Sequence, residues 1–372
     1  MTRYYSQYYA DAGHTGSLDV DAPTMLTPVW ETKIEADEST HPAARLLITT
    51  DGELLVDGTD AVHALSADGE LLWARPKWPS SPVVYKNGLI CFAIQKRKDR
   101  VMVIDLNNSV QIEEIVFPEH VDGAYAMLFE PTSEGIVAQI QYANIPEMRK
   151  ANFIVYCADA DSYGYKWARR YEDQYSALVP AISAADNLIV TASAEEILCF
   201  DLMASDPEPE PRHTFPIPWK GNATWMSCAP DGLLHFAGFA NGRARAAAIH
   251  AEGTDANEWI SEARPGMQMA PIAPPIIGTD LVYVLSRGAL SALSHHRLAW
   301  MYRPRQNEFS YATALADGGL LAVEAPNLLH RIDRSGQATA VVEVAQTITA
   351  PPVATPEGRV VVGAGEMIYA FN

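Results

Sequence analysis

The chain has 372 residues, of which 48% are hydrophobic, and a formal net charge of −19. This acidity disfavours nonspecific attraction to nucleic acid or to an anionic membrane, so we expect neither as a partner. No stretch approaches the roughly 20 apolar residues of a membrane span, and the first 22 residues show no apolar core of a secretory signal. We therefore expect a cytoplasmic protein that does not insert into a membrane.

The first clear repeat predicts four short strands separated by turn residues. Apolar runs occupy residues 44–49, 54–58, 61–65 and 71–77, and the Gly-containing segments TDGE and SADGE separate two pairs of them. Short strands with turn residues at close spacing are typical of an antiparallel sheet. The same order recurs at residues 273–305, which run from APPIIG to LAWMYRPR.

A short apolar sequence motif ends the third strand of each repeat. Its last residues are Leu65, Ile104, Cys157, Phe200, Ile249, Leu293, Ile332 and Phe371. The gaps of 39, 53, 43, 49, 44, 39 and 39 residues average about 44. A four-stranded repeat of this length is typical of a β-propeller blade.

The last repeat lacks its fourth strand. Residues 27–34, TPVWETKI, resemble the outer strand LLWARPK of the first repeat but follow no strands of their own. We therefore predict an all-β, eight-bladed propeller of four-stranded antiparallel blades whose last blade is closed by the N-terminal strand. The alternative is seven blades, with the irregular third or fifth repeat as an insertion. The predicted domains are an N-terminal arm at 1–22 and one propeller at 23–372.

Tryptophan recurs in the outer strand of the repeats. Large aromatic residues at one register are typical of packing between blades, so we assign this role to Trp30, Trp73, Trp167, Trp259 and Trp300. The second, fourth and seventh repeats place Ile115, Phe215 and Val341 near that position.

A family resemblance is carried by the pattern ALxxxGxxxW at residues 64–73, by the APP that opens an inner strand, and by the HTG box at residues 14–16. The chain resembles the quinoprotein-type repeat of pyrroloquinoline quinone dehydrogenases and outer-membrane assembly lipoprotein propellers. For an enzyme of that kind, the resemblance implies a quinone, a calcium ion, a vicinal cysteine pair and a secretion signal. The four cysteines are far apart in this sequence and no such signal is visible, so we expect no cofactor.

The cysteines and acidic turns predict no metal site. Cys91, Cys157, Cys199 and Cys228 form no CxxC or His/Cys cluster, which indicates buried free thiols and neither zinc nor a disulfide framework. The Asp-Gly turns are typical of tight hairpins and lack calcium-loop spacing.

One rim of the predicted propeller carries a basic patch and several aromatics. The patch combines Lys96, Arg97, Lys98 and Arg100 with Arg149 and Lys150 from the next repeat, and the aromatics are Trp78, Tyr175, Trp225 and Tyr311. Such a patch fits an acidic partner, although charged hairpin tips also serve to block edge pairing. Exposed aromatics are enriched at protein interfaces.

The expected function is a noncatalytic scaffold that binds a protein partner, acidic if the basic patch contacts it. No GxSxG elbow or HExxH helix is present, so no catalytic residue is assigned. The alternatives are a quinoprotein-type dehydrogenase and a glycan-binding propeller that uses the rim aromatics.

Overall fold

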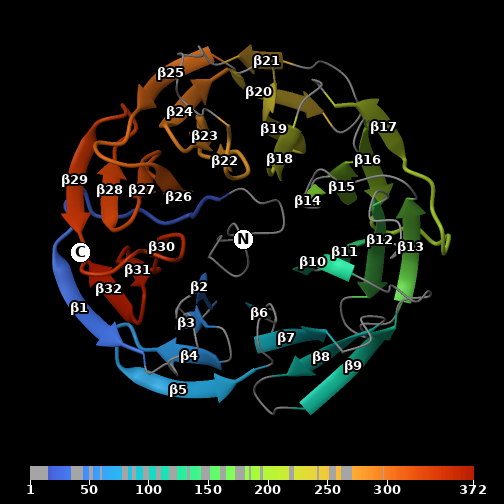
Figure 1. Ribbon diagram of the computed structural model, residues 1–372, viewed down its shortest axis with the longest axis horizontal. Helices are drawn as coiled ribbons and strands as arrows, with labels where there is room; N and C mark the ends of the chain where they lie inside the picture. The colour runs from blue at the N-terminus through green and yellow to red at the C-terminus, as the bar shows by residue number, and fades with distance from the viewer. Residues whose placement is uncertain are drawn as a thin grey trace. The chain divides into compact units, whose positions relative to one another are not determined.

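The computed structural model describes much of the chain as β-strand (Figure 1). The described residues are 16–34, 45–49, 53–58, 61–77, 83–85, 89–94, 100–105, 110–116, 124–131, 135–143, 151–159, 165–171, 181–183, 186–192, 196–217, 222–240, 243–250, 257–260, 270–295 and 297–372. Within these ranges the regular structure is all β, and no helix there is long and apolar enough to cross a membrane.

The chain divides into two compact units. The first contains residues 1–80, 237–246 and 259–372, and the second contains residues 81–236 and 247–258. In both units, consecutive strands pair into four-stranded antiparallel sheets (Figure 1).

The first unit contains four such sheets. Their strands are β2 (Arg45–Ile48), β3 (Leu54–Asp57), β4 (Ala61–Leu65) and β5 (Leu71–Pro76); β22 (Ile276–Ile277), β23 (Val282–Ser286), β24 (Ala289–Ser294) and β25 (Arg297–Tyr302); β26 (Phe309–Ala314), β27 (Leu320–Glu324), β28 (Leu328–Ile332) and β29 (Ala338–Glu343); and β30 (Val353–Ala354), β31 (Val360–Ala364), β32 (Met367–Phe371) and β1 (Pro28–Lys33).

The second unit contains three sheets and most of a fourth. Their strands are β6 (Val83–Tyr85), β7 (Leu89–Ile94), β8 (Arg100–Asp105) and β9 (Val110–Val116); β10 (Ala124–Pro131), β11 (Gly135–Ala143), β12 (Ala151–Asp159) and β13 (Tyr165–Tyr171); β14 (Ala181–Ser183), β15 (Leu188–Ala192), β16 (Glu196–Asp201) and β17 (His213–Pro216); and β18 (Asn222–Cys228), β19 (Leu233–Ala240), β20 (Arg243–His250) and β21 (Asn257–Ile260).

The C-terminal sheet takes its outer strand from the N-terminal part of the chain. β1 pairs antiparallel with β32 from Pro28↔Phe371 to Lys33↔Met367. Thr27 and Asn372 extend the ladder by exchanging backbone hydrogen bonds of 2.6 and 2.9 Å. The β-branched residues of β1 favour a strand, and its pairing covers the edge that β32 would otherwise expose.

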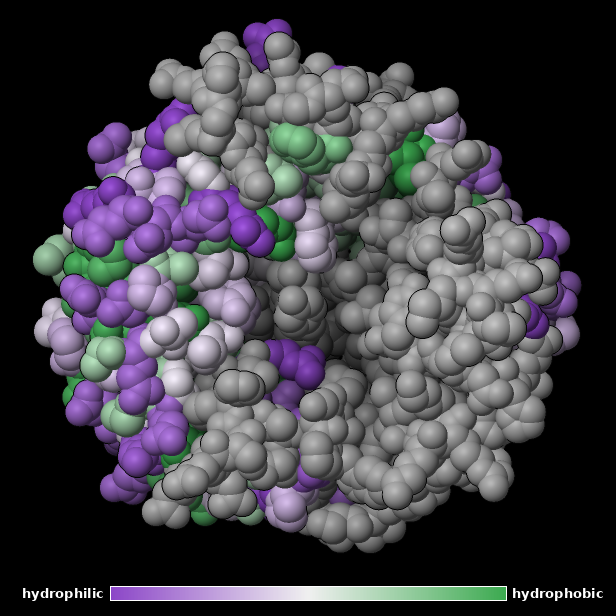
Figure 2. Space-filling view, in the orientation of Figure 1, coloured by the Kyte–Doolittle hydropathy of each residue, from purple (hydrophilic) through white to green (hydrophobic). Residues whose placement is uncertain are grey.

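The apolar pattern of the strands determines where the core lies. The middle strands β27 and β31 are buried at every residue, whereas the outer strands β1 and β5 alternate between exposed and half-buried residues. Over β25, β29 and β1, the surface in Figure 2 is a mixture of hydrophilic residues and isolated apolar ones. The largest core cluster joins the sheets of β2–β5, β26–β29 and β30–β32 within the first unit.

The segment before β1 packs into this core. Leu18 N–H donates to the Ala314 carbonyl and Ala314 N–H donates to the Gly16 carbonyl, both at 3.0 Å, beside the parallel bridge of Ser17 with Ala314. Leu18 is 1% exposed. Residues 16–22, which the sequence places in a separate arm, thus add a short parallel segment to β26.

The register corrects the sequence alignment of the outer strands. In β1, β5 and β25, a bulge directly precedes Trp30, Trp73 and Trp300 in the chain. The equivalent bulge in β29 gives Ala340 this position, and not Val341. In β9 it gives Glu113, two residues from Ile115. A bulge consumes one residue of the strand, which shifts the equivalent position along the sequence.

Candidate functional site

Tryptophan side chains link neighbouring sheets of the first unit. Trp30 Nε1–H donates to the Ala67 carbonyl at 3.0 Å, and Thr32 Oγ1–H donates to the Gly69 carbonyl at 2.5 Å. Gly69 has a φ of +83°, and a Cβ built on it would lie 2.6 Å from the indole of Trp30. The indole ring therefore packs directly on the backbone of the turn between β4 and β5, and only a residue without a side chain, glycine, leaves room for it.

The same arrangement recurs between the sheets of β22–β25 and β26–β29. Trp300 Nε1–H donates to the Arg334 carbonyl at 2.9 Å. Gly336, with a φ of +85°, lies beneath the indole, and its Cβ would be 2.6 Å from the ring. An outer-strand indole over a glycine of the next sheet's turn is thus a repeated contact, which we call the tryptophan lock.

The other outer-strand tryptophans have different surroundings. Trp167 is fully buried, and its ring centroid lies 5.6 Å from that of Phe200. Trp73 is half-buried, with the guanidinium carbon of Arg75 4.7 Å from its ring centroid. The side chain of Trp259 is outside the described residues.

The tryptophan lock is missing where β29 meets the sheet of β30–β32 and β1. Ala340 occupies the tryptophan position of β29 and packs against the largest core cluster together with Val342. β32 and β1 are not consecutive in the chain, so no short turn with a glycine joins them. Neither the indole nor its glycine turn fills this interface.

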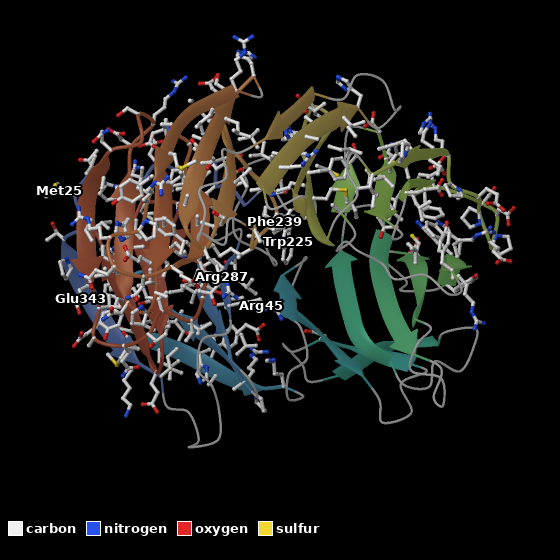
Figure 3. All side chains as sticks on the ribbon, turned by 45° about the horizontal axis from the view of Figure 1, so that its top comes forward. Met25, Arg45, Trp225, Phe239, Arg287 and Glu343 are labelled. Atoms are coloured by element: carbon white, nitrogen blue, oxygen red, sulfur yellow. The ribbon has the colours of Figure 1, made fainter. Side chains whose placement is uncertain are left out.

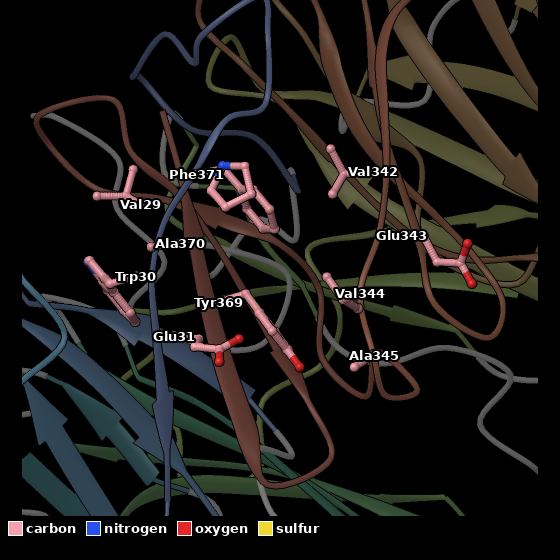
Figure 4. Close-up of a pocket in the computed structure, with 11 residues that line it drawn as sticks. Val29, Trp30, Glu31, Val342, Glu343, Val344, Ala345, Tyr369, Ala370 and Phe371 are labelled. Carbon is pink, nitrogen blue, oxygen red and sulfur yellow. The ribbon is translucent and has the colours of Figure 1, made fainter.

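A groove of about 440 Å³ lies between the end of β29 and the strands β1 and β32. Val342, which lines it, lies two residues after Ala340 and therefore on the same face of β29. The apolar residues that line the groove include Val29, Val342, Val344, Tyr369 and Phe371. Figure 4 shows Val342 and Val344 facing β1 and β32 across the groove, while Glu343 points to the other side of β29 and Val29 and Trp30 point to the other side of β1. Val342 and Tyr369 are only partly buried, so apolar surface in the groove is accessible to a ligand.

Two acidic residues contribute negative charge near these apolar walls. Glu31 and Glu343 are both exposed; the Glu343 carboxylate points away from the groove (Figure 4) and lies at the outer edge of the first unit in Figure 3, as does Met25. Burial raises the pKa of Tyr369, and the nearby carboxylate of Glu31 raises this pKa further. The groove is therefore an apolar surface in a negative electrostatic environment.

Buried charged groups lie where middle strands of the first unit end. Asp57, at the end of β3, lies 3.3 Å from Arg45 Nη2 and 3.2 Å from Lys77 Nζ, and its side chain is 1% exposed. Arg45 and Asp57 are cross-strand partners of β2 and β3. The paired charges hold the residue after β5 against β3, which is a structural role.

Glu324, at the end of β27, has a similar role. Its carboxylate accepts backbone N–H bonds from Arg305, Gln306 and Asn307 at 2.9, 2.6 and 2.8 Å. Its Oε2 lies 3.1 Å from Nε2 of the buried His330. Burial would raise the pKa of Glu324, but the three donors and His330 hold it below its usual range.

Most of the residues predicted for the partner-binding rim fall outside the described part of the chain. Lys96, Arg97, Lys98, Arg149, Lys150, Trp78 and Tyr175 lie outside it, and Arg100 is described only as the first backbone position of β8. Trp225 is half-buried in β18 (Figure 3). Tyr311 is half-buried in β26, and its hydroxyl donates to the Thr349 carbonyl at 3.1 Å. Tyr311 is not among the residues that line the groove, and Trp225 belongs to the second unit.

The groove itself is absent from the sequence prediction. The sequence feature that could have indicated the groove is the absence of a tryptophan from the outer strand of the seventh repeat. Only the strand register shows that Ala340 occupies the tryptophan position there.

The thiols that the structure describes are buried. Cys157, Cys199 and Cys228 are free, and burial raises the pKa of Cys157 and of Cys199 to about 12. Such thiols stay protonated at neutral pH and are poor nucleophiles. Within the described ranges, no three His, Cys, Asp or Glu side chains are grouped so that they could hold a metal ion.

No protein-family model and no curated protein sequence matches the chain. Solved structures do match it. Quinohemoprotein alcohol dehydrogenase from Comamonas testosteroni superimposes with a TM-score of 0.68 at 11% identity, over 99% of this chain and 80% of that one. BamB from Moraxella catarrhalis gives a TM-score of 0.61 at 11% identity, over 94% of this chain and 100% of that one.

The WD40 β-propeller domain of Doa1 matches at a TM-score of 0.51 with 10% identity, over 93% of this chain and 97% of that domain. At these identities the likeness is one of fold. The chain has the β-propeller fold, and its structural neighbours include quinoprotein-type propellers, as the repeat resemblance predicts.

Proposed function

We propose that this chain is a noncatalytic scaffold, an eight-bladed propeller closed by β1, that binds a protein partner. The sheet order and the pairing of β1 with β32 support the blade number and the closure. Propellers serve both as enzymes and as interaction modules, so the fold alone does not select between these roles.

The observation that carries the proposal is the groove of about 440 Å³ between β29 and β1. Tryptophan locks complete two other interfaces of the first unit, whereas Val342 and Tyr369 at this interface are only partly buried. An accessible apolar surface with a polar rim is typical of a site that another protein covers.

Affinity capture from the native cell tests the proposal. Val342→Glu places a charge in the groove and should abolish recovery of any partner that binds there. Leu298→Glu is the matched control, because Leu298 is also exposed on an outer strand, β25, at 45%. Equal recovery with both variants would show that the groove does not bind the partner.

The basic patch of Lys96, Arg97, Lys98 and Arg100 with Arg149 and Lys150 remains a proposed second surface, suited to an acidic partner. Reversal of Lys96, Arg97, Lys98 and Arg100 to Glu tests it. Unchanged recovery of the partner would remove this surface from the proposal.

A further inference from the structure

We infer that the groove receives an aromatic side chain, tryptophan above all, from a basic segment of a protein partner. This inference rests on the proposed function, because it identifies what binds at the surface proposed above. The inserted ring would take the place of the tryptophan lock that the interface between β29 and β1 lacks.

The first argument is what fills the corresponding space elsewhere in the first unit. Trp30 and Trp300 each extend an indole from an outer strand and donate Nε1–H to a carbonyl of the next sheet. Ala340 holds the same register position in β29 and ends at Cβ. Among the four sheets described in the first unit, the interface between β29 and β1 is therefore the one that lacks a tryptophan side chain at this position.

The second argument is the size and the chemistry of the walls. A volume of about 440 Å³ is within the range of small ligand sites, roughly 300–1,000 Å³. An aromatic ring buries a large area while ordering few rotatable bonds, which makes tryptophan a frequent anchor in interfaces. Val342 and Tyr369, which are only partly buried, supply apolar contacts for such a ring.

The third argument is charge. Glu31 lies at the apolar walls, and Glu343 adds a second carboxylate on the other side of β29, where it accepts a hydrogen bond from Asn327 Nδ2 at 3.3 Å. The chain as a whole carries a net charge of −19. A segment with Lys or Arg beside the aromatic is complementary to this rim, whereas a second copy of the same acidic chain would be repelled.

Fluorescence anisotropy with short labelled peptides tests the inference on the full chain. The probe is GKKWKKG, and the matched peptides are GKKAKKG, GKKLKKG and GEEWEEG. We expect the probe to bind at least about tenfold more tightly than each of the other three, a difference of about 1.4 kcal/mol. Binding should weaken as salt is raised. Equal affinity for the leucine or the glutamate peptide would overturn the inference.

Variants of the chain then locate the peptide. Ala340→Trp should restore the missing lock, raise the Tm and remove at least nine-tenths of probe binding, whereas Leu298→Glu should leave binding unchanged. Val342→Glu provides a second test in case the tryptophan variant folds poorly. Glu31→Lys should weaken binding of GKKWKKG and strengthen binding of GEEWEEG. Full probe binding by Val342→Glu or by a folded Ala340→Trp chain would overturn the inference.

The outcome also separates this inference from the proposed function. If a native partner requires the groove but none of the aromatic peptides binds, the scaffold proposal stands and the aromatic inference fails. If neither the partner nor the probe depends on the groove, both fail.

Discussion

The tryptophan lock depends on single residues on both of its sides. Trp30 and Trp300 supply the ring and the Nε1–H donor, and Gly69 and Gly336 supply a backbone without a side chain. The positive φ of both glycines adds a second reason for the residue type, because other residues are strained there.

Gly69→Ala should lower the free energy of unfolding by about 2–4 kcal/mol, from backbone strain and overpacking against Trp30. Urea denaturation would measure the change. In a Trp30→Ala background the overpacking is already relieved, so the same glycine substitution should cost only about 1 kcal/mol. Additive costs in this double-mutant cycle would contradict the lock.

Glu324 and His330 should make stability fall with acid. Burial lowers the pKa of His330 from 6.5, so between 6.5 and the lowered value the unfolded chain binds more protons and stability decreases as the pH falls. The lowered pKa of Glu324 acts in the same direction below 4.5. The Tm of the wild type should therefore drop from pH 7 to pH 5, and less so in His330→Gln. An equal drop in both proteins would assign the effect to other groups.

At the level of elements, the segment of residues 16–26 and the strand β1 attach the N-terminal part of the chain to the C-terminal sheets. Arg331 contributes from β28: its Nη1–H donates to the Ile332 carbonyl at 2.7 Å, and its Nη2 pairs with Asp317. Its Nε–H donates to the Pro23 carbonyl at 3.3 Å. A buried arginine with these partners ties residues before β1 to the turn that follows β26.

Leu18→Ala should destabilise the protein by about 2–4 kcal/mol, because it removes a side chain that is 1% exposed from the core. Met25→Ala is the control, since Met25 is 64% exposed in the same segment and its truncation should change stability by less than about 0.5 kcal/mol. Similar effects of the two substitutions in urea denaturation would show that residues 16–22 do not pack as described.

Thr32→Pro should disrupt the pairing of β1 with β32, since proline lacks the N–H of a sheet ladder. Amides of β32 at 367–371 should then exchange faster with deuterated solvent, while those of β24 keep their protection. Thr32→Val is the control that removes only the hydroxyl bond to Gly69. Unchanged protection of β32 in the proline variant would contradict the shared sheet.

The elements also show how far the sequence predicts this fold. Period-two apolar runs and Asp-Gly turns located the strands of the first unit, and the resemblance of residues 27–34 to an outer strand identified β1. The bulge that moves the tryptophan position to Ala340 leaves no mark in composition, so the groove was not predicted. The pairing of residues 16–18 with β26 joins positions about 300 residues apart, which local patterns do not encode.

At the scale of the whole molecule, the β-propeller fold persists at 11% identity to its structural neighbours. What such neighbours share is the strand pattern and the packing of apolar strands, which many sequences satisfy. Function therefore has to be argued from a site, and here the site is an interface between sheets that the chain itself leaves unfilled.

Photo-crosslinking from inside the groove tests the central claim most directly. p-Benzoyl-phenylalanine placed at Val342 in the native cell should form a discrete adduct with one protein partner, while the same group placed at Leu298 on β25 should not. The adduct should disappear when Ala340→Trp is added to the chain. Absence of an adduct at position 342, or the same adducts from both positions, would contradict a partner-binding role for this groove.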